Sequence, residues 1–331
     1  MNRALKSTLF SLFLLSGFFF YAHAQNVPGI SDPITFRMIP QNPNPSERVD
    51  LSAQSFSTDL NKAVFKWYVN GKLHAEGVGM KSISVSSGQA GSFTSVRVEI
   101  STSDFGVITN EFAFRPAEVV LMWEADTYTP PFYKGKAAHS FGGTFKVTAL
   151  PEFFSASGKR INPKDLIYTW KKNGEVQGDA SGFAKDSYIT SQTSYLRDGE
   201  EISVEVSSPR ENYAGSASVT IRPSVPEVLF YENSPLYGVI YERSLRGTHT
   251  LANEEMTLKA EPFGMSTDGP TSGLLTFSWN LNGAMIAEFA NRNQIVLRKV
   301  DGSAGQSSLG VTVQNSRKLL QGAQSSITIS Q

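Results

Sequence analysis

Two segments of the 331-residue chain combine tyrosines with a carboxylate at matched spacing. In both segments a glutamate follows an aromatic residue and precedes the last tyrosine by nine residues. The candidate binding residues are Trp123, Glu124, Tyr128 and Tyr133 in the first segment, and Tyr231, Glu232, Tyr237 and Tyr241 in the second. Exposed aromatic rings beside a carboxylate suit the binding of a sugar ring or of a partner protein.

The same two segments also fit a purely structural role. Both contain proline, which interrupts a strand, so the alternative is a split first strand whose aromatics pack against the preceding domain. Burial distinguishes the two interpretations, because tyrosines that are mostly buried at domain seams would exclude a binding strip. The pair Phe153-Phe154 is a second candidate for exposed apolar surface, with core packing as its alternative.

No residue pattern typical of catalysis occurs in the sequence. The chain has no cysteine, which excludes disulfides, thiolate metal sites and thiol chemistry. The four histidines, at positions 23, 74, 139 and 249, lack ligand spacing, and we expect those of the mature chain to be exposed in loops. The usual nucleophile, phosphate-loop and zinc-protease motifs are missing. The run Asp198-Gly199-Glu200-Glu201 indicates a solvated turn rather than an acid/base pair.

The sequence therefore predicts a protein that is not an enzyme, with no catalytic residue, no cofactor and no metal site. Calcium at domain junctions stays an open alternative, because it would need six to eight oxygen ligands. The pairs Glu124 with Asp126 and Glu232 with Glu242 supply few of these.

Composition narrows the class of protein. Thirty basic and thirty acidic residues give a formal charge of zero, which argues against nucleic acid as a partner. Hydrophobic residues make up 40% of the chain, enough for packed cores.

The N-terminus has the three parts of a secretory signal. Arg3 and Lys6 precede an apolar run over residues 9–21, and Ala22-His23-Ala24 forms a cleavage site. The run is short for a bilayer span, which needs about 20 residues. We expect cleavage after Ala24 and an exported mature chain without a transmembrane span, whether periplasmic, held at the cell surface or released.

Three repeats of about 100 residues organise the rest of the chain. Each has an aromatic residue, a spacer, a tryptophan, two further residues and then Asn-Gly. The tryptophans are Trp67, Trp170 and Trp279, preceded at two residues by Phe65, Tyr168 and Phe277. Period-two alternation surrounds these anchors, as in residues 49–53, 145–149 and 256–260, and predicts strands with one buried face. Asn-Gly predicts a hairpin after each tryptophan strand, and the tryptophans should form the structural core.

This pattern resembles immunoglobulin-like folds, and in particular bacterial immunoglobulin-like or PKD-like modules of exported proteins. The resemblance implies an all-β chain of three tandem antiparallel sandwiches. Apolar residues stand where antibody-type domains carry paired cysteines: Leu51, Val147 and Leu258 on one strand, and Val98, Val204 and Val311 on the other. Antibody-type domains also carry a tyrosine at the corner before the second of these strands, and other residues replace it in this chain.

The ends of the predicted strands and the Arg-Pro dipeptides set the expected domain limits. We expect a signal at residues 1–24 and immunoglobulin-like domains at 25–116, 117–223 and 224–331, joined by short linkers into a semi-rigid rod. The expected function is that of a structural spacer or of an adhesion and protein-interaction module at the cell envelope, whose partner is a protein or another envelope component. The alternative is a carbohydrate-binding protein that uses the aromatic segments, with a polysaccharide as partner. Unpaired edge strands are a further contact surface.

Overall fold

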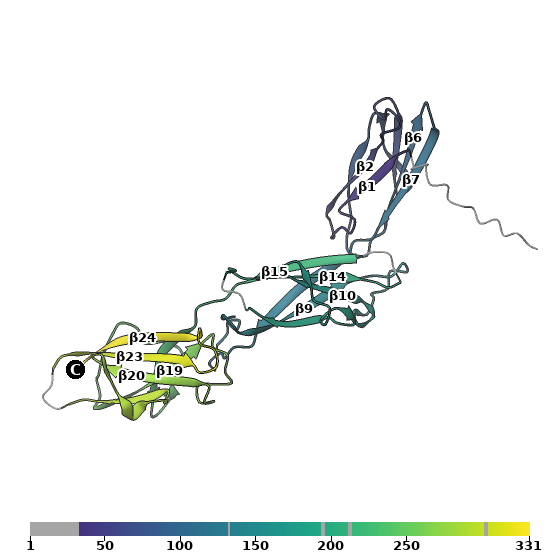
Figure 1. Ribbon diagram of the computed structural model, residues 1–331. Coiled ribbons are helices and arrows are strands. Elements are labelled where there is room, and N and C mark those ends of the chain that lie inside the picture. The colour runs from purple at the N-terminus through teal and green to yellow at the C-terminus, as the bar shows by residue number, and fades with distance from the viewer. Residues whose placement is uncertain (1–32, 132, 193–195, 211–213, 301–303) are drawn as a thin grey trace, which may run out of the picture.

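The computed structural model describes residues 33–131, 133–192, 196–210, 214–300 and 304–331. Within these ranges the protein is all-β, with three sandwiches that follow one another in an elongated arrangement (Figure 1). The expected signal segment and its cleavage site lie outside the described residues. No helix in the described ranges has the length and apolar character needed to cross a membrane.

The first sandwich packs a three-stranded sheet on a four-stranded one. The three-stranded sheet has the order β1 (Thr35–Ile39), β2 (Arg48–Gln54) and β5 (Ser82–Ser86). The other has the order β4 (Lys72–Val78), β3 (Val64–Val69), β6 (Thr94–Thr102) and β7 (Gly106–Phe114). Buried and exposed residues alternate along β2, as the sequence pattern predicts.

The second sandwich repeats this topology. One sheet has the order β13 (Ser187–Ser191), β9 (Thr144–Glu152) and β8 (Glu118–Ala125). The other is built from β10 (Ile167–Lys172), β14 (Glu200–Ser207) and β15 (Ala214–Ile221), with the short strands β11 (Glu175–Val176) and β12 (Gly182–Phe183) on β10. The short 3-10 helix η1 (Pro163–Asp165) precedes β10.

The third sandwich adds strands to both sheets. One has the order β17 (Gly238–Val239), β16 (Glu227–Ser234), β19 (Glu255–Phe263) and β22 (Gln294–Arg298). The other has the order β18 (Thr248–Thr250), β24 (Gly322–Ser330), β23 (Gln306–Asn315), β20 (Leu275–Leu281) and β21 (Ala284–Met285). The 3-10 helix η2 (Ala287–Phe289) follows β21. Strand β18 pairs with β24 in parallel, whereas β16 belongs to the other sheet. The N-terminal part of this sandwich therefore contributes strands to both sheets.

Each sandwich is built around its tryptophan. Trp67, Trp170 and Trp279 are buried, as are the aromatics two residues before them. Each indole nitrogen donates a hydrogen bond to a backbone carbonyl 13 or 15 residues further along the chain: to Met80 at 2.9 Å, to Lys185 at 2.9 Å and to Arg292 at 2.8 Å. A buried indole N–H needs such a partner. The three cores therefore share one polar contact as well as one apolar anchor.

The Asn-Gly pairs form the predicted hairpin turns. Asn70 and Gly71 have φ of 48° and 78°, and the two later pairs are alike. Positive φ at both central residues is the requirement of a type I′ turn, which asparagine and glycine meet with least strain. The apolar residues at the cysteine positions are buried in all three cores. Strand order, tryptophan position and these cores define immunoglobulin-like sandwiches.

Candidate binding site at the second junction

The segment after β8 forms the junction between the second and third sandwiches. We call its described residues 126–131 and 133–143 the linking segment. The amide of Tyr128 donates to the carbonyl of Met265 at 2.8 Å, and the Gln321 side chain donates to the carbonyl of Phe141 at 3.2 Å. Lys318 also donates to the carbonyl of Gly142. Polar contacts along the whole segment thus fix it against the third sandwich.

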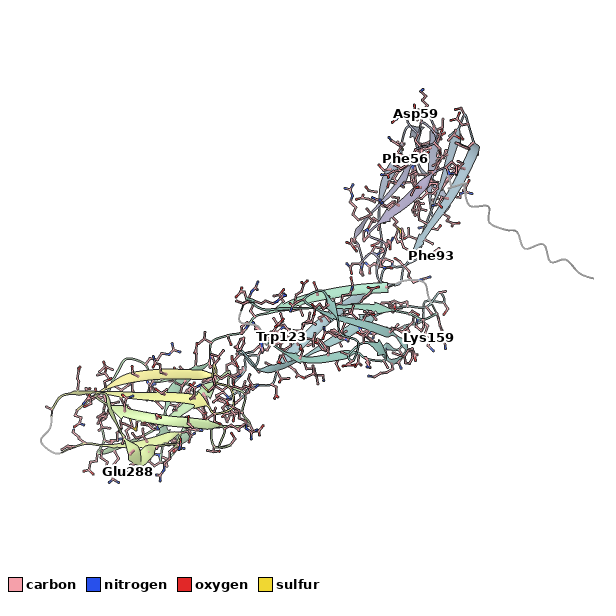
Figure 2. The ribbon with its side chains drawn as sticks, in the orientation of Figure 1. Phe56, Asp59, Phe93, Trp123, Lys159 and Glu288 are labelled. Carbon is pink, nitrogen blue, oxygen red and sulfur yellow. The ribbon has the colours of Figure 1, made fainter. Side chains whose placement is uncertain are left out.

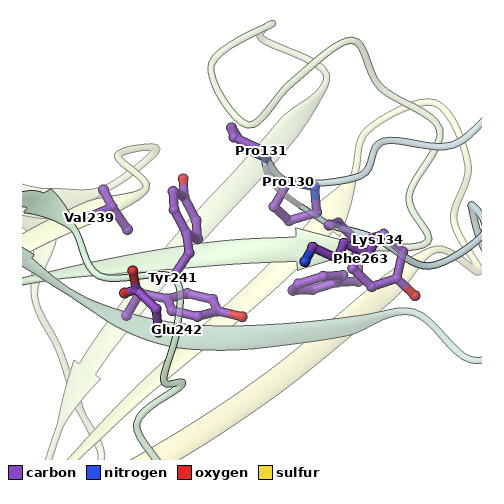
Figure 3. Close-up of a pocket in the computed structure, with 9 residues that line it drawn as sticks. Pro130, Pro131, Lys134, Val239, Tyr241, Glu242 and Phe263 are labelled. Carbon is purple, nitrogen blue, oxygen red and sulfur yellow. The ribbon is translucent and has the colours of Figure 1, made fainter.

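A pocket of about 440 Å³ opens beside this segment. Figure 3 shows Lys134 and Phe263 together at one side, and Tyr241 with Glu242 facing them across the space. The pocket is lined by Pro130, Pro131, Tyr133, Lys134, Tyr231, Val239, Tyr241, Glu242 and Phe263. The walls therefore come from both the linking segment and the third sandwich.

A second pocket, of about 260 Å³, is also lined by Tyr133 and Phe263 and so neighbours the first. The two rings meet edge to face with centroids 5.7 Å apart. Both residues line both pockets, and Tyr128 and Glu227 belong to the second pocket alone. We call the two together the junction site: two neighbouring pockets that share the aromatic pair Tyr133–Phe263.

The buried carboxylate of Glu261 holds the aromatic walls in place. Glu261 has no exposed surface, and its Oε1 accepts hydrogen bonds from Tyr241 at 2.7 Å and forms an ion pair with Lys259 at 2.5 Å. Its Oε2 accepts from the hydroxyl of Tyr128 at 3.4 Å. One carboxylate thus orients a wall of each pocket, and one of those walls belongs to the linking segment.

This arrangement alters the acidity of its members. Burial, and then the negative charge of Glu261, raise the pKa of the Tyr128 hydroxyl well above its usual value. The same two effects raise the pKa of Tyr231. Burial lowers the pKa of Lys259, but its hydrogen bonds to Glu261 and Tyr241 outweigh burial and hold the pKa above the ordinary value. The tyrosines therefore stay neutral and the lysine charged at physiological pH, which keeps the cluster bonded.

The structure brings half of the predicted binding residues together. Tyr133, Tyr231 and Tyr241 line one pocket, and Tyr128 lines its neighbour. Tyr133 is 46% exposed, Tyr231 is buried, and Tyr128 and Tyr241 are half-buried. The tyrosines at this seam are therefore neither a fully exposed strip nor a closed core.

The other predicted residues lie outside the junction site. Tyr237 is 80% exposed at the turn between β16 and β17, and Glu232 is half-buried at the end of β16. Trp123 packs partly against the second core, and the ammonium of Lys136 lies 3.2 Å from its ring centroid. Glu124 is exposed on the edge strand β8. Sequence spacing alone did not distinguish these four from the residues that meet.

Residues outside the predicted binding set complete the site, and of these the sequence singles out only Glu242, as a candidate calcium ligand. Lys134, Glu242 and Phe263 line the larger pocket, and Lys259 and Glu261 lie behind it. Alternation along residues 256–260 predicts that Lys259 faces water, and only the tyrosines that cover this face of β19 bury it. The one sequence signal was the matched spacing of the two aromatic segments. It identifies the tyrosines of the site but not the residues that they contact.

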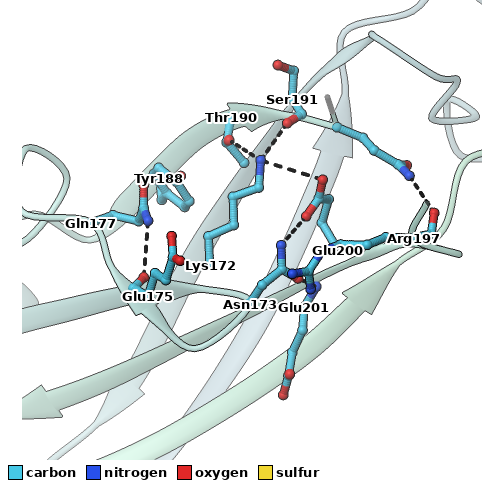
Figure 4. Close-up of polar contacts among 11 residues, drawn as sticks. Lys172, Asn173, Glu175, Gln177, Tyr188, Thr190, Ser191, Arg197, Glu200 and Glu201 are labelled. Carbon is cyan, nitrogen blue, oxygen red and sulfur yellow. Dashed lines mark hydrogen bonds and ion pairs between the residues drawn. The ribbon is translucent and has the colours of Figure 1, made fainter. Parts of the chain in front are cut away.

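Two expectations about polar residues were wrong. His139 is only 1% exposed, and its ring packs edge to face on Phe145 of β9. Glu200 is also buried, within an ion pair of 3.7 Å to Lys172 and a hydrogen bond from Asn173 of the Asn-Gly turn (Figure 4). Asp198 and Glu201 remain exposed, so the run does not form an acid pair.

Among the described residues, no three His, Asp or Glu side chains are grouped to hold a metal ion. Phe153 is buried in the second core, while Phe154 approaches the first junction. There, Gly91 has φ of 77° and its Cα lies so close to the Phe154 ring that a Cβ would contact it at 2.5 Å. A glycine is required at this point of contact between the first two sandwiches.

No family model and no curated protein match the chain. Solved structures with some likeness include the three N-terminal domains of the bacteriophage RB49 Highly Immunogenic Outer Capsid protein, at 13% identity over 90% of this chain and 97% of that one, with a TM-score of 0.27. The central fibronectin-III array of RIM-binding protein matches at 9% identity over 90% and 95%, with a TM-score of 0.29.

Fibronectin(III)-like modules of Clostridium thermocellum CbhA match at 16% identity over 57% of this chain and 94% of that one, with a TM-score of 0.27. At these TM-scores the likenesses carry no argument about arrangement or function. The assignment to the immunoglobulin-like class rests on strand order and core, and any function must be argued from the sites of this chain.

Proposed function

We propose that the protein is a non-enzymatic exported rod that acts as a spacer and protein-interaction module at the cell envelope. The observation that carries this proposal is the construction of the second junction, where hydrogen bonds along the linking segment fix the third sandwich to the second. A junction of this kind keeps the two ends of the molecule apart, which is what a spacer needs. We place the domain limits at 25–116, 117–223 and 224–331, after a signal cleaved behind Ala24.

The outer end of the first sandwich supports an interaction role. Phe56 is fully exposed, at 103%, and lies at the end remote from the second sandwich (Figure 2). Its loop is held by Ser55, which donates to the carbonyl of Pro33 at 2.5 Å, and by Thr58, which donates to Asp104 at 2.8 Å. A large apolar side chain on a fixed loop is the kind of anchor that protein interfaces use.

Fractionation and cross-linking of the native protein in its host cells test this proposal. The expected result is recovery outside the cytoplasm, with a mature N-terminus at Gln25 and cross-links to an envelope protein. Recovery of uncleaved protein in the cytoplasm would contradict it. Small-angle X-ray scattering of the mature chain should give an elongated particle, and a compact particle would argue against the spacer role.

Carbohydrate binding is the second candidate, and the junction site is the observation that favours it. Tyrosines from both aromatic segments meet around one pocket, beside the carboxylate of Glu242 and the ammonium of Lys134. Ring faces with a polar rim match the apolar faces and hydroxyl edges of a sugar. Saturable binding on a glycan array by the mature protein would support this candidate, and its loss in a Tyr133→Ala variant would assign it to the junction.

A further inference from the structure

We propose that the ligand of the junction site is a linear, uncharged sugar chain that places one pyranose ring in each of the two pockets. This inference rests on the second candidate function above and specifies its ligand. The two pockets share the ring pair Tyr133–Phe263, so a chain that runs past this pair enters both.

The sizes of the pockets favour a ligand that spans them. Sites that enclose a drug-sized ligand measure roughly 300–1,000 Å³. The larger pocket, at about 440 Å³, is near the lower end of that range, and the smaller, at about 260 Å³, falls below it. The smaller pocket is therefore too small by itself for a ligand of that size. A chain of two or more rings would contact both.

The walls of the pockets are ring faces held in fixed positions. Glu261 accepts a hydrogen bond of 2.7 Å from Tyr241 in the larger pocket and a longer contact of 3.4 Å from Tyr128 in the smaller one, whose backbone amide is bonded to Met265. Because these hydroxyls are already bonded to the protein, the faces of the rings are what remain for a ligand. A pyranose presents C–H groups to such faces, and walls that are already in place lose little entropy on binding.

The charges at the rim favour an uncharged sugar over an anionic one. Glu242 at the larger pocket and Glu227 at the smaller one are exposed carboxylates, with Lys134 as the cation of the larger pocket. Carboxylates accept hydrogen bonds from the hydroxyls of a sugar, whereas they repel a uronic acid or a sulfated chain. Lys134 offsets Glu242 at the larger pocket, so it is the Glu227 carboxylate at the smaller pocket that disfavours a sugar with negative charge.

The larger pocket lies between the linking segment and the third sandwich. Pro130 and Lys134 belong to the linking segment, whereas Tyr241 and Glu242 belong to the third sandwich. A ligand that contacts both sets stabilises the arrangement in which they face each other, by the amount of its preference for that arrangement.

Isothermal titration of the mature protein with cello-oligosaccharides and malto-oligosaccharides of one to six glucose units tests the proposal. At least one series should bind, with affinity rising at least tenfold from one unit to the longer chains and then levelling off. Tyr133→Ala should weaken binding of the hexasaccharide by about tenfold, the value of one lost aromatic contact of up to 1.5 kcal/mol.

Two variants separate the site from folding. Glu242→Gln alters only an exposed rim group and should weaken binding without a change in thermal midpoint. Phe56→Ala removes an exposed aromatic far from the junction and should leave binding unchanged, which makes it the matched control for Tyr133→Ala. Tyr128→Ala should remove the gain in affinity with chain length while monosaccharide binding persists.

The outcomes distinguish this inference from the function on which it rests. If the hexasaccharide binds no better than glucose, or if Tyr133→Ala binds like the unmodified protein, sugar binding survives as a function but the two-pocket site is wrong. If neither series binds at millimolar concentration, both the inference and the carbohydrate candidate fail, and the spacer and interaction role is left standing.

Discussion

The hydroxyl of Tyr241 donates a hydrogen bond of 2.7 Å to Oε1 of Glu261, a carboxylate with no exposed surface. A buried carboxylate is costly unless its charge is balanced and its oxygens are hydrogen-bonded. Here the balance comes from Lys259, and a further hydrogen bond comes from Tyr128, a residue of the linking segment. The stability of the third sandwich and the position of the preceding one are therefore linked through Glu261.

Removing this carboxylate should destabilise the third sandwich strongly. Glu261→Ala leaves the half-buried Lys259 without its counter-charge, and loss of one partner of a buried pair costs about 3–5 kcal/mol, so we expect a loss near the lower end of that range. Urea unfolding of the mature protein measures this difference. The matched control is Glu255→Ala, which breaks the exposed pair with Arg298 at 2.7 Å and should cost less than about 1 kcal/mol. Equal losses in the two variants would refute the role given to Glu261.

The two tyrosines of this cluster should differ in their contributions. Tyr241→Phe removes a hydrogen bond of 2.7 Å to a charged group and should cost about 1.5–3 kcal/mol. Tyr128→Phe removes a contact of 3.4 Å, which is long for such a bond, and should cost less than about 1 kcal/mol. Thermal midpoints of the two variants, compared with that of the unmodified protein, check the order. A larger loss for Tyr128→Phe would be inconsistent with the geometry.

The protein should lose stability as the pH falls below about 6.5. Burial lowers the pKa of His139 in the folded protein, although the charge of Glu200 partly opposes this. The unfolded chain, with an ordinary histidine pKa of about 6.5, therefore binds a proton first, and stability present above that pH is lost as it falls. Urea midpoints at pH 7.5 and 5.5 measure the loss.

The variant His139→Phe should flatten this pH dependence. The exposed His74 provides the control, since His74→Asn should retain the full dependence. An unchanged slope in His139→Phe would show that other groups, and not the buried imidazole, cause the loss.

Each core tryptophan should stabilise its own sandwich. Trp67→Ala removes a buried side chain together with its hydrogen bond to Met80, which should cost about 3–5 kcal/mol in the first sandwich. Differential scanning calorimetry should show one transition shifted to lower temperature and the others nearly unchanged. Joint loss of all transitions would contradict independent folding of the three sandwiches.

The sequence was sufficient for the fold because the fold depends on local pattern. Alternation along β2, the tryptophan of β3 and the Asn-Gly turn that follows are each read from a few neighbouring residues. The same holds for the apolar residues Leu51 and Val98 at the positions of the absent disulfide, which are buried in the first core.

The site depends on how distant segments meet, and for that reason only part of it could be predicted. Tyr133 and Tyr241 were identified from their spacing, but the sequence contains no sign that Phe263 would pack on the first of them. Glu261 lies in β19 just beyond the alternating residues 256–260, and its carboxylate is bonded by Tyr128 of the linking segment and by Tyr241. His139 was expected in an exposed loop for the same reason: the covering partner lies on another element.

We propose that the protein acts by contact at particular surfaces, and site-specific photo-cross-linking in living host cells is the direct test. A photoreactive amino acid would replace Phe56 at the outer tip, Tyr133 at the junction site or Glu288 as an exposed control position. We expect a defined protein adduct from position 56, a polysaccharide adduct from position 133 and none from position 288. Equal labelling at all three positions, or no adduct at either 56 or 133, would contradict it.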